Sequence, residues 1–70
     1  MVPLSVADIG EEYIVKKVGG LPEVKRHLED LGFVAGSDIS VINKLGENVI
    51  VNVKDTRIAI SKEMAMKIYV

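Results

Sequence analysis

Apolar and polar residues alternate with a period of two along much of the second half of the chain. The alternation runs through residues 39–42, 49–53 and 57–60. Such a period predicts strands with one buried face, and the abundance of valine and isoleucine favours the same structure. In the last stretch we expect Ile58 and Ile60 to point inward. Turn-forming residues at 45–48 and 54–56 separate the stretches, so they predict tight hairpin connections.

A single stretch has the three-and-four spacing of an amphipathic helix. Its apolar residues predict one buried stripe, and they are Leu21, Val24, Leu28 and Leu31. Pro22 stands where the first helical residue belongs, because the missing N–H of proline is not needed there. Gly32 is the expected left-handed stop. These signals predict a helix over residues 21–31.

The two ends of the chain carry shorter signals. Ser5 and Asp8 have the spacing of a helix-start box, with room for one helical turn between Leu4 and Ile9. Residues 12–18 alternate as one strand, and a glycine pair at 19–20 predicts a turn. Ser61 is placed to cap a last helical turn over residues 62–66. Residues 68–70 predict a short closing strand.

These elements together predict the fold class. About five short strands joined by tight turns, with one helix inserted after the first, are typical of a mainly β, small, partly open barrel of the SH3-like type. The chain has 70 residues and shows no repeats or linkers, so we expect one domain spanning residues 1–70.

Composition narrows the classes of function. Nine basic and ten acidic residues give a net charge of −1, so the basic surface that nucleic-acid binding needs is not expected. There is no cysteine, and hence no disulfide or thiolate metal site. The N-terminal residues lack the pattern of a signal peptide, and no apolar run approaches the ~18 residues of a membrane span. We therefore expect a cytoplasmic protein without direct membrane insertion.

The candidate chemistry is sparse. His27 is the only histidine, and no serine or threonine near it suggests a nucleophile with its base, so we do not expect an enzyme. Glu23, His27 and Asp30 share the polar face of the expected helix, and carboxylate and imidazole suit ferrous iron. The alternative is a solvated charged face, since Lys25 and Arg26 beside them oppose cation binding. No resident cofactor is predicted, and bound ferrous iron stays open.

Protein binding fits the pattern best. A partly open barrel leaves strand edges that can accept another chain. Phe33, Val34 and Leu45 are apolar residues in expected connections, which run over protein surfaces and often carry function. Phe33 could instead fold under the helix as part of the core. Arg57 could pair with an acidic partner or cover apolar surface with its stem. Weak self-association through exposed edges is a further alternative.

The exit of the helix carries a family resemblance. The run Leu28-x-x-Leu31-Gly32-Phe33-Val34-Ala35-Gly36 resembles the FeoA family of small ferrous-iron transport proteins. The resemblance continues through the later strands to the last residues and also covers Leu4, Gly10 and the glycine pair, so it spans nearly the whole chain. The SH3-like C-terminal domain of DtxR-type iron-dependent repressors is similar as well.

The resemblance implies a function in ferrous-iron uptake. FeoA-like proteins are accessory or regulatory proteins that act in the cytoplasm on FeoB, the membrane GTPase that moves ferrous iron. The likeness to repressor domains implies the alternative of a stand-alone, metal-responsive SH3-like module that binds a metal ion.

Overall fold

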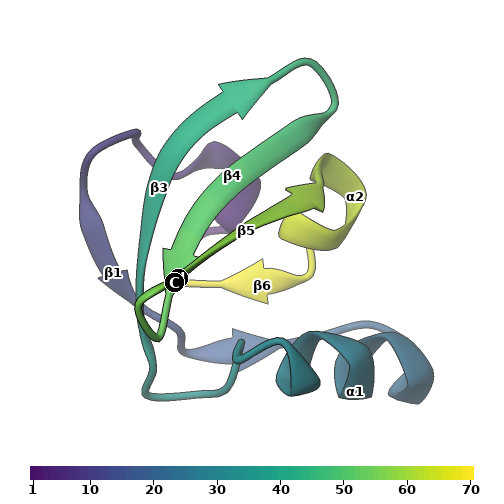
Figure 1. Ribbon diagram of the computed structural model, residues 1–70. Helices are drawn as coiled ribbons and strands as arrows, with labels where there is room; N and C mark the ends of the chain where they lie inside the picture. Colours follow the sequence, from purple (N-terminus) through teal and green to yellow (C-terminus); the bar gives the residue numbers. More distant parts are fainter.

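A curved four-stranded antiparallel sheet forms the larger part of the protein (Figure 1). The computed structural model describes all 70 residues. The strands stand in the order β1-β3-β4-β5, with bounds β1 (Glu12–Ile14), β3 (Asp38–Leu45), β4 (Asn48–Val53) and β5 (Thr56–Ser61). The three stretches of alternating residues therefore form neighbouring strands, as predicted.

Two-residue turns join the central strands and set their register. Leu45 pairs with Asn48 across the first turn, and Val53 pairs with Thr56 across the second. Lys54 and Asp55 in the second turn both have positive φ, of 50° and 62°, which is typical of the turn that matches the twist of a β-hairpin. Both hairpins confirm the sequence prediction.

A second, two-stranded sheet closes the other side of the barrel. It contains β2 (Lys17–Val18) and β6 (Ile68–Tyr69) in antiparallel pairing. The N-terminal segment joins β6 from its other side, because the N–H of Val2 donates to the Val70 carbonyl at 2.9 Å and the N–H of Val70 donates back at 2.9 Å. The two ends of the chain thus lie side by side.

The expectation of one strand over residues 12–18 is wrong. The N–H of Val15 donates to the Ser37 carbonyl at 2.9 Å, whereas the next N–H, that of Lys16, donates to the Tyr69 carbonyl at 2.8 Å. Val15 is therefore a corner at which the chain leaves the large sheet and enters the small one. The barrel consequently has six short strands, which agrees with the prediction of about five.

Helix α1 (Pro22–Asp30) lies across one end of the barrel next to β2 (Figure 1). Pro22 is its first residue, as predicted. Leu28 is fully buried, and Val24 and Leu31 pack against the core from partly buried positions. Leu21 is 73% exposed, so its expected place in the buried stripe is wrong. The reason is that Leu21 is the extended residue before the helix and does not follow the helical period.

The other helical signals have mixed outcomes. A single 3₁₀ turn, η1 (Leu4–Val6), occupies the expected place near the N-terminus. Its N-cap residue is Pro3 and no side chain caps it, so the helix-start box predicted at Ser5 is wrong. Helix α2 (Lys62–Ala65) follows β5 directly. The hydroxyl of Ser61 accepts a 3.2 Å hydrogen bond from the N–H of Met64, which confirms the predicted cap.

The core fills the space between the two sheets, α1 and η1. It is built from fifteen buried apolar residues and contains no buried polar side chain. Ile60 is buried and Ile58 packs against the core, so both point inward as expected. The larger fully buried side chains are Phe33, Leu4, Leu28, Ile68, Val15, Val41, Val49, Val51 and Val53. Side chains therefore occupy the barrel interior, which is usual for barrels of this size.

Candidate partner-binding surface

Phe33 belongs to the core and not to the surface. Its side chain is 0% exposed, beneath the end of α1. Of the two interpretations of Phe33, the structure selects the buried one, so this residue cannot touch a partner in the folded protein. Its expected place among the partner-binding residues is wrong because the helix stop turns the chain inward at this point.

Val34 lies in the tight connection between α1 and β3. Its N–H donates to the Gly32 carbonyl at 3.0 Å, and its own carbonyl accepts from the N–H of Ser37 at 3.0 Å. The side chain is half-buried. Val34 therefore offers only part of its surface to a partner.

Leu45 and Arg57 lie on the outer face of the large sheet. Leu45 is 55% exposed at the β3–β4 turn. Arg57 is exposed in β5 opposite Asn52, and its guanidinium takes part in no hydrogen bond within the protein. Asn52 is four residues along β4 from Asn48, the partner of Leu45, so Leu45 and Arg57 are about 13 Å apart along the strand direction, with β4 between their strands.

The strip between Leu45 and Arg57 contains two apolar residues that sequence reasoning missed. Ile50 and Ala59 are direct cross-strand partners on the outer face, where Ala59 is exposed and Ile50 half-buried. The alternation carried the signal, since Val49, Val51 and Val53 face inward and Ile50 must therefore face outward. We call Leu45, Ile50, Arg57 and Ala59 the outer strip.

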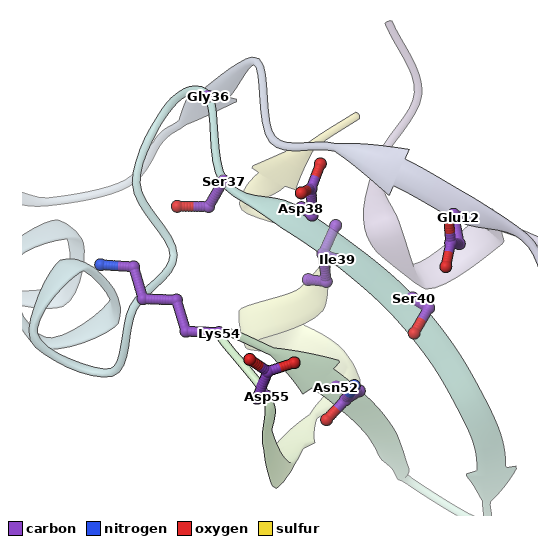
Figure 2. A pocket seen from close by; sticks show the side chains of 9 residues that line it. All are labelled: Glu12, Gly36, Ser37, Asp38, Ile39, Ser40, Asn52, Lys54 and Asp55. Atoms are coloured by element: carbon purple, nitrogen blue, oxygen red, sulfur yellow. The ribbon is translucent and has the colours of Figure 1, made fainter.

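A polar depression opens beside Arg57, at the end of the same face away from Leu45 (Figure 2). Its volume is about 490 Å³, and Glu12, Asp38 and Asp55 contribute three carboxylates to its lining. Lys54 also lines it, but its stem extends toward the end of α1, where its carbons lie next to Gly32. No group of three or more histidine, cysteine or carboxylate side chains is placed to hold a metal ion. The depression is therefore a polar part of the surface in which carboxylates outnumber the single lysine.

The candidate metal ligands on α1 do not form a site either. Glu23, His27 and Asp30 are all exposed, and they do not make up a group that could hold an ion. Lys25 and Arg26 stand on the same short helix and are exposed as well. The geometry matches a solvated charged face, the alternative that the sequence left open.

Neither helix combines the length and the apolar composition needed to cross a bilayer.

The exposed apolar side chains are scattered over turns, chain ends and the outer face of the sheet. They are Met1, Val2, Val6, Ile9, Ile14, Leu21, Ile42, Leu45 and Met66.

The fold is SH3-like, and solved FeoA structures and metal-dependent repressors share it. The zinc complex of FeoA from Stenotrophomonas maltophilia, described as an SH3 domain protein, is 29% identical with a TM-score of 0.84, over 94% of this chain and 85% of that one. FeoA from Chlorobium tepidum is 30% identical with a TM-score of 0.86, over 97% and 67%. A manganese-dependent transcriptional repressor shares the fold at 17% identity, with a TM-score of 0.88, over 97% of this chain and 39% of the repressor.

The FeoA domain family matches residues 2–70. A Methanocaldococcus jannaschii protein assigned as Fe(2+) transport protein A is 40% identical over 70 residues, which are 100% of this chain and 85% of that protein. This chain therefore belongs to the FeoA family.

Proposed function

We propose that this protein is a cytoplasmic accessory protein of ferrous-iron uptake that binds the cytoplasmic part of the FeoB-type membrane GTPase and regulates it. The match to the FeoA family over residues 2–70 carries the proposal. The similarity to an assigned Fe(2+) transport protein A supports the same process.

The surface supports protein binding over small-molecule chemistry. The barrel interior is filled with apolar side chains and contains no buried polar group that could serve a reaction. The outer strip instead presents a leucine, an unpaired guanidinium and a small apolar spot within one sheet face. Arginine next to apolar side chains is a combination that occurs often where proteins bind one another.

The test is a binding measurement with the purified cytoplasmic GTPase domain, by calorimetry, in the presence of GDP and of a non-hydrolysable GTP analogue. We expect a complex in at least one nucleotide state. Failure to bind in every nucleotide state contradicts the proposal.

A pair of variants then locates the contact. Leu45→Ser should weaken the complex several-fold, because it removes an exposed apolar side chain at the β3–β4 turn. Ile14→Ser is the matched control, since Ile14 is 53% exposed on the same face but in β1, at the far edge of the sheet from β5. Equal binding by both variants would remove Leu45 from the interface.

The alternative of a stand-alone metal-responsive module rests on the shared fold with metal-dependent repressors. That likeness lies below 25% identity and concerns the fold alone. Neither the acidic depression nor the polar face of α1 supplies a ligand group for a metal ion. Accessory binding is therefore the function we put forward.

A further inference from the structure

One edge of the large sheet is open. The N–H of Lys62 donates to the Glu47 carbonyl at 2.8 Å, just beyond the end of β5. In an antiparallel pair, hydrogen-bonded pairs recur at every second residue. Val49 with Ile60 and Val51 with Ile58 are therefore the bonded pairs of β4 and β5.

The residues between those pairs direct their backbone groups away from the sheet. Arg57 and Ala59 are both exposed, and neither makes a backbone hydrogen bond outside the β4–β5 ladder. Their N–H and C=O groups consequently face solvent along β5, which is the last strand of the sheet. Such a row of unpaired groups is a template for pairing with another strand.

The opposite edge is short and irregular by comparison, because its outermost strand, β1, has three residues against six in β5. β1 pairs with the first part of β3, and the N–H of Gly10 donates to the Val41 carbonyl at 2.9 Å. Further along β3, the side chain of Asn43 accepts a 2.8 Å hydrogen bond from the N–H of Lys44. The register also shifts between Val41 and Asn43, and such irregularities discourage pairing. β5 is therefore the longer and more regular of the two edges, and the better one for adding a strand.

We propose that β5 binds an extended segment of the GTPase partner as a fifth strand of the sheet, an inference that rests on the function proposed above. The segment carries a carboxylate opposite Arg57 and, two residues away on the same face, an apolar side chain over Ala59 and Ile50. The spacing follows from the period of a strand, because Arg57 and Ala59 are two residues apart on the outer face.

Charge distinguishes this occupant from a second copy of the chain. Arg57 is the only charged residue in β5. A second β5 laid along the edge offers no carboxylate to the guanidinium, and it brings another arginine to the same seam. An acidic segment supplies the missing charge, and charge-assisted hydrogen bonds to arginine are among the strong ones.

Hydrogen exchange at single amides, followed by NMR, tests the open edge directly. In the free protein we expect the amides of Arg57 and Ala59 to exchange fast and those of Ile58 and Ile60 to be protected. With the cytoplasmic GTPase domain in the nucleotide state that binds, the amides of Arg57 and Ala59 should slow by at least about tenfold, the factor of one strong backbone hydrogen bond. Protection that instead rises with the concentration of the free protein would assign the edge to a second copy and overturn the proposal.

Two pairs of variants complete the test. Ala59→Pro removes an N–H that the fold does not use, which edge strands tolerate, and should weaken binding at least about tenfold, whereas Ala59→Val keeps the N–H and should weaken binding clearly less than Ala59→Pro does. Arg57→Glu should weaken binding more than Arg57→Lys. If Ala59→Pro does not fold, this pair still tests whether the partner segment carries a carboxylate opposite Arg57, and equal binding by the two variants would overturn the proposed occupant. A folded Ala59→Pro variant that binds like the parent overturns the proposal that the partner adds a strand to β5, but it leaves the proposed function intact. A parent protein that does not bind at all overturns the proposed function, and this occupant with it.

Discussion

The backbone N–H of Phe33 donates a 3.0 Å hydrogen bond to the carbonyl of Leu28, and both side chains are fully buried. The N–H of Gly32, between them, donates to the Glu29 carbonyl at 3.0 Å. These two bonds and the apolar contact form the Schellman arrangement that ends a helix. The helix stop is thus also the point at which the loop enters the core.

Gly32→Ala should lower the free energy of unfolding by about 1–2 kcal/mol, the cost of placing an L-residue in the left-handed region. Gly32 has φ +109°, and a Cβ there would meet no atom closer than 3.5 Å, so the penalty is conformational and not a clash. Urea unfolding followed by circular dichroism measures it. Lys25→Ala, in the exposed middle of the same helix, is the control and should change stability by less than about 0.5 kcal/mol. Equal stability of the two variants would contradict the expected conformational penalty for a side chain at position 32.

Phe33→Ala should cost about 3–5 kcal/mol, which is much of the total stability of roughly 4–10 kcal/mol expected for a chain of this length. We expect this variant to be largely unfolded at 37 °C. Phe33→Leu keeps most of the buried volume and should cost about 1 kcal/mol. Because Phe33 is buried, the Leu variant should bind the GTPase domain like the parent. A folded Phe33→Leu variant with strongly weakened binding would place Phe33 in the interface after all.

Ser61→Ala removes the hydrogen bond from the N–H of Met64 and should cost about 1 kcal/mol. For a domain of this size the melting temperature should fall by roughly 4–8 °C, measured by differential scanning calorimetry. Ser61→Asp restores an acceptor at the same place and should melt close to the parent. If Asp fails to restore what Ala removes, the cap is not the cause of the loss.

His27→Ala should leave the response to ferrous and manganous ions unchanged. His27 is exposed on α1 and belongs to no group of residues that could hold an ion. Anaerobic calorimetric titration of the parent and the variant is the measurement. Metal binding by the parent that disappears in His27→Ala would revive the alternative of a metal-responsive module.

Local signals in the sequence predicted most of the elements because each depends on a few neighbouring residues. The two hairpins, the helix from Pro22, the glycine stop and the cap at Ser61 all belong to this kind. The prediction of one strand over residues 12–18 was wrong because the end of that strand does not depend on neighbouring residues. Its alternation continues through Val15, but nothing local tells at which residue the chain leaves one sheet for the other.

The candidate surface was only partly within reach of the sequence. The sequence singled out Leu45 as an apolar residue in a connection and Arg57 as a residue that could pair with an acidic partner, and both are exposed in the structure. Their relation to Ile50 and Ala59 was missed, because a shared face follows from the pairing register of β4 with β5. The open edge of β5 was likewise out of reach, since it depends on which strand ends the sheet.

The sequence alone determined the mainly β class, the longer helix with its glycine stop, and the family, since these depend on period, turn chemistry and a nearly full-length resemblance. Only the tertiary structure decided that Phe33 completes the core and that Leu21 is left in solvent. It also decided that β5 is a six-residue edge strand, in which the backbone groups of Arg57 and Ala59 are left unpaired. The physical reason is that burial and strand order arise from contacts between residues far apart in the chain, which no local pattern records.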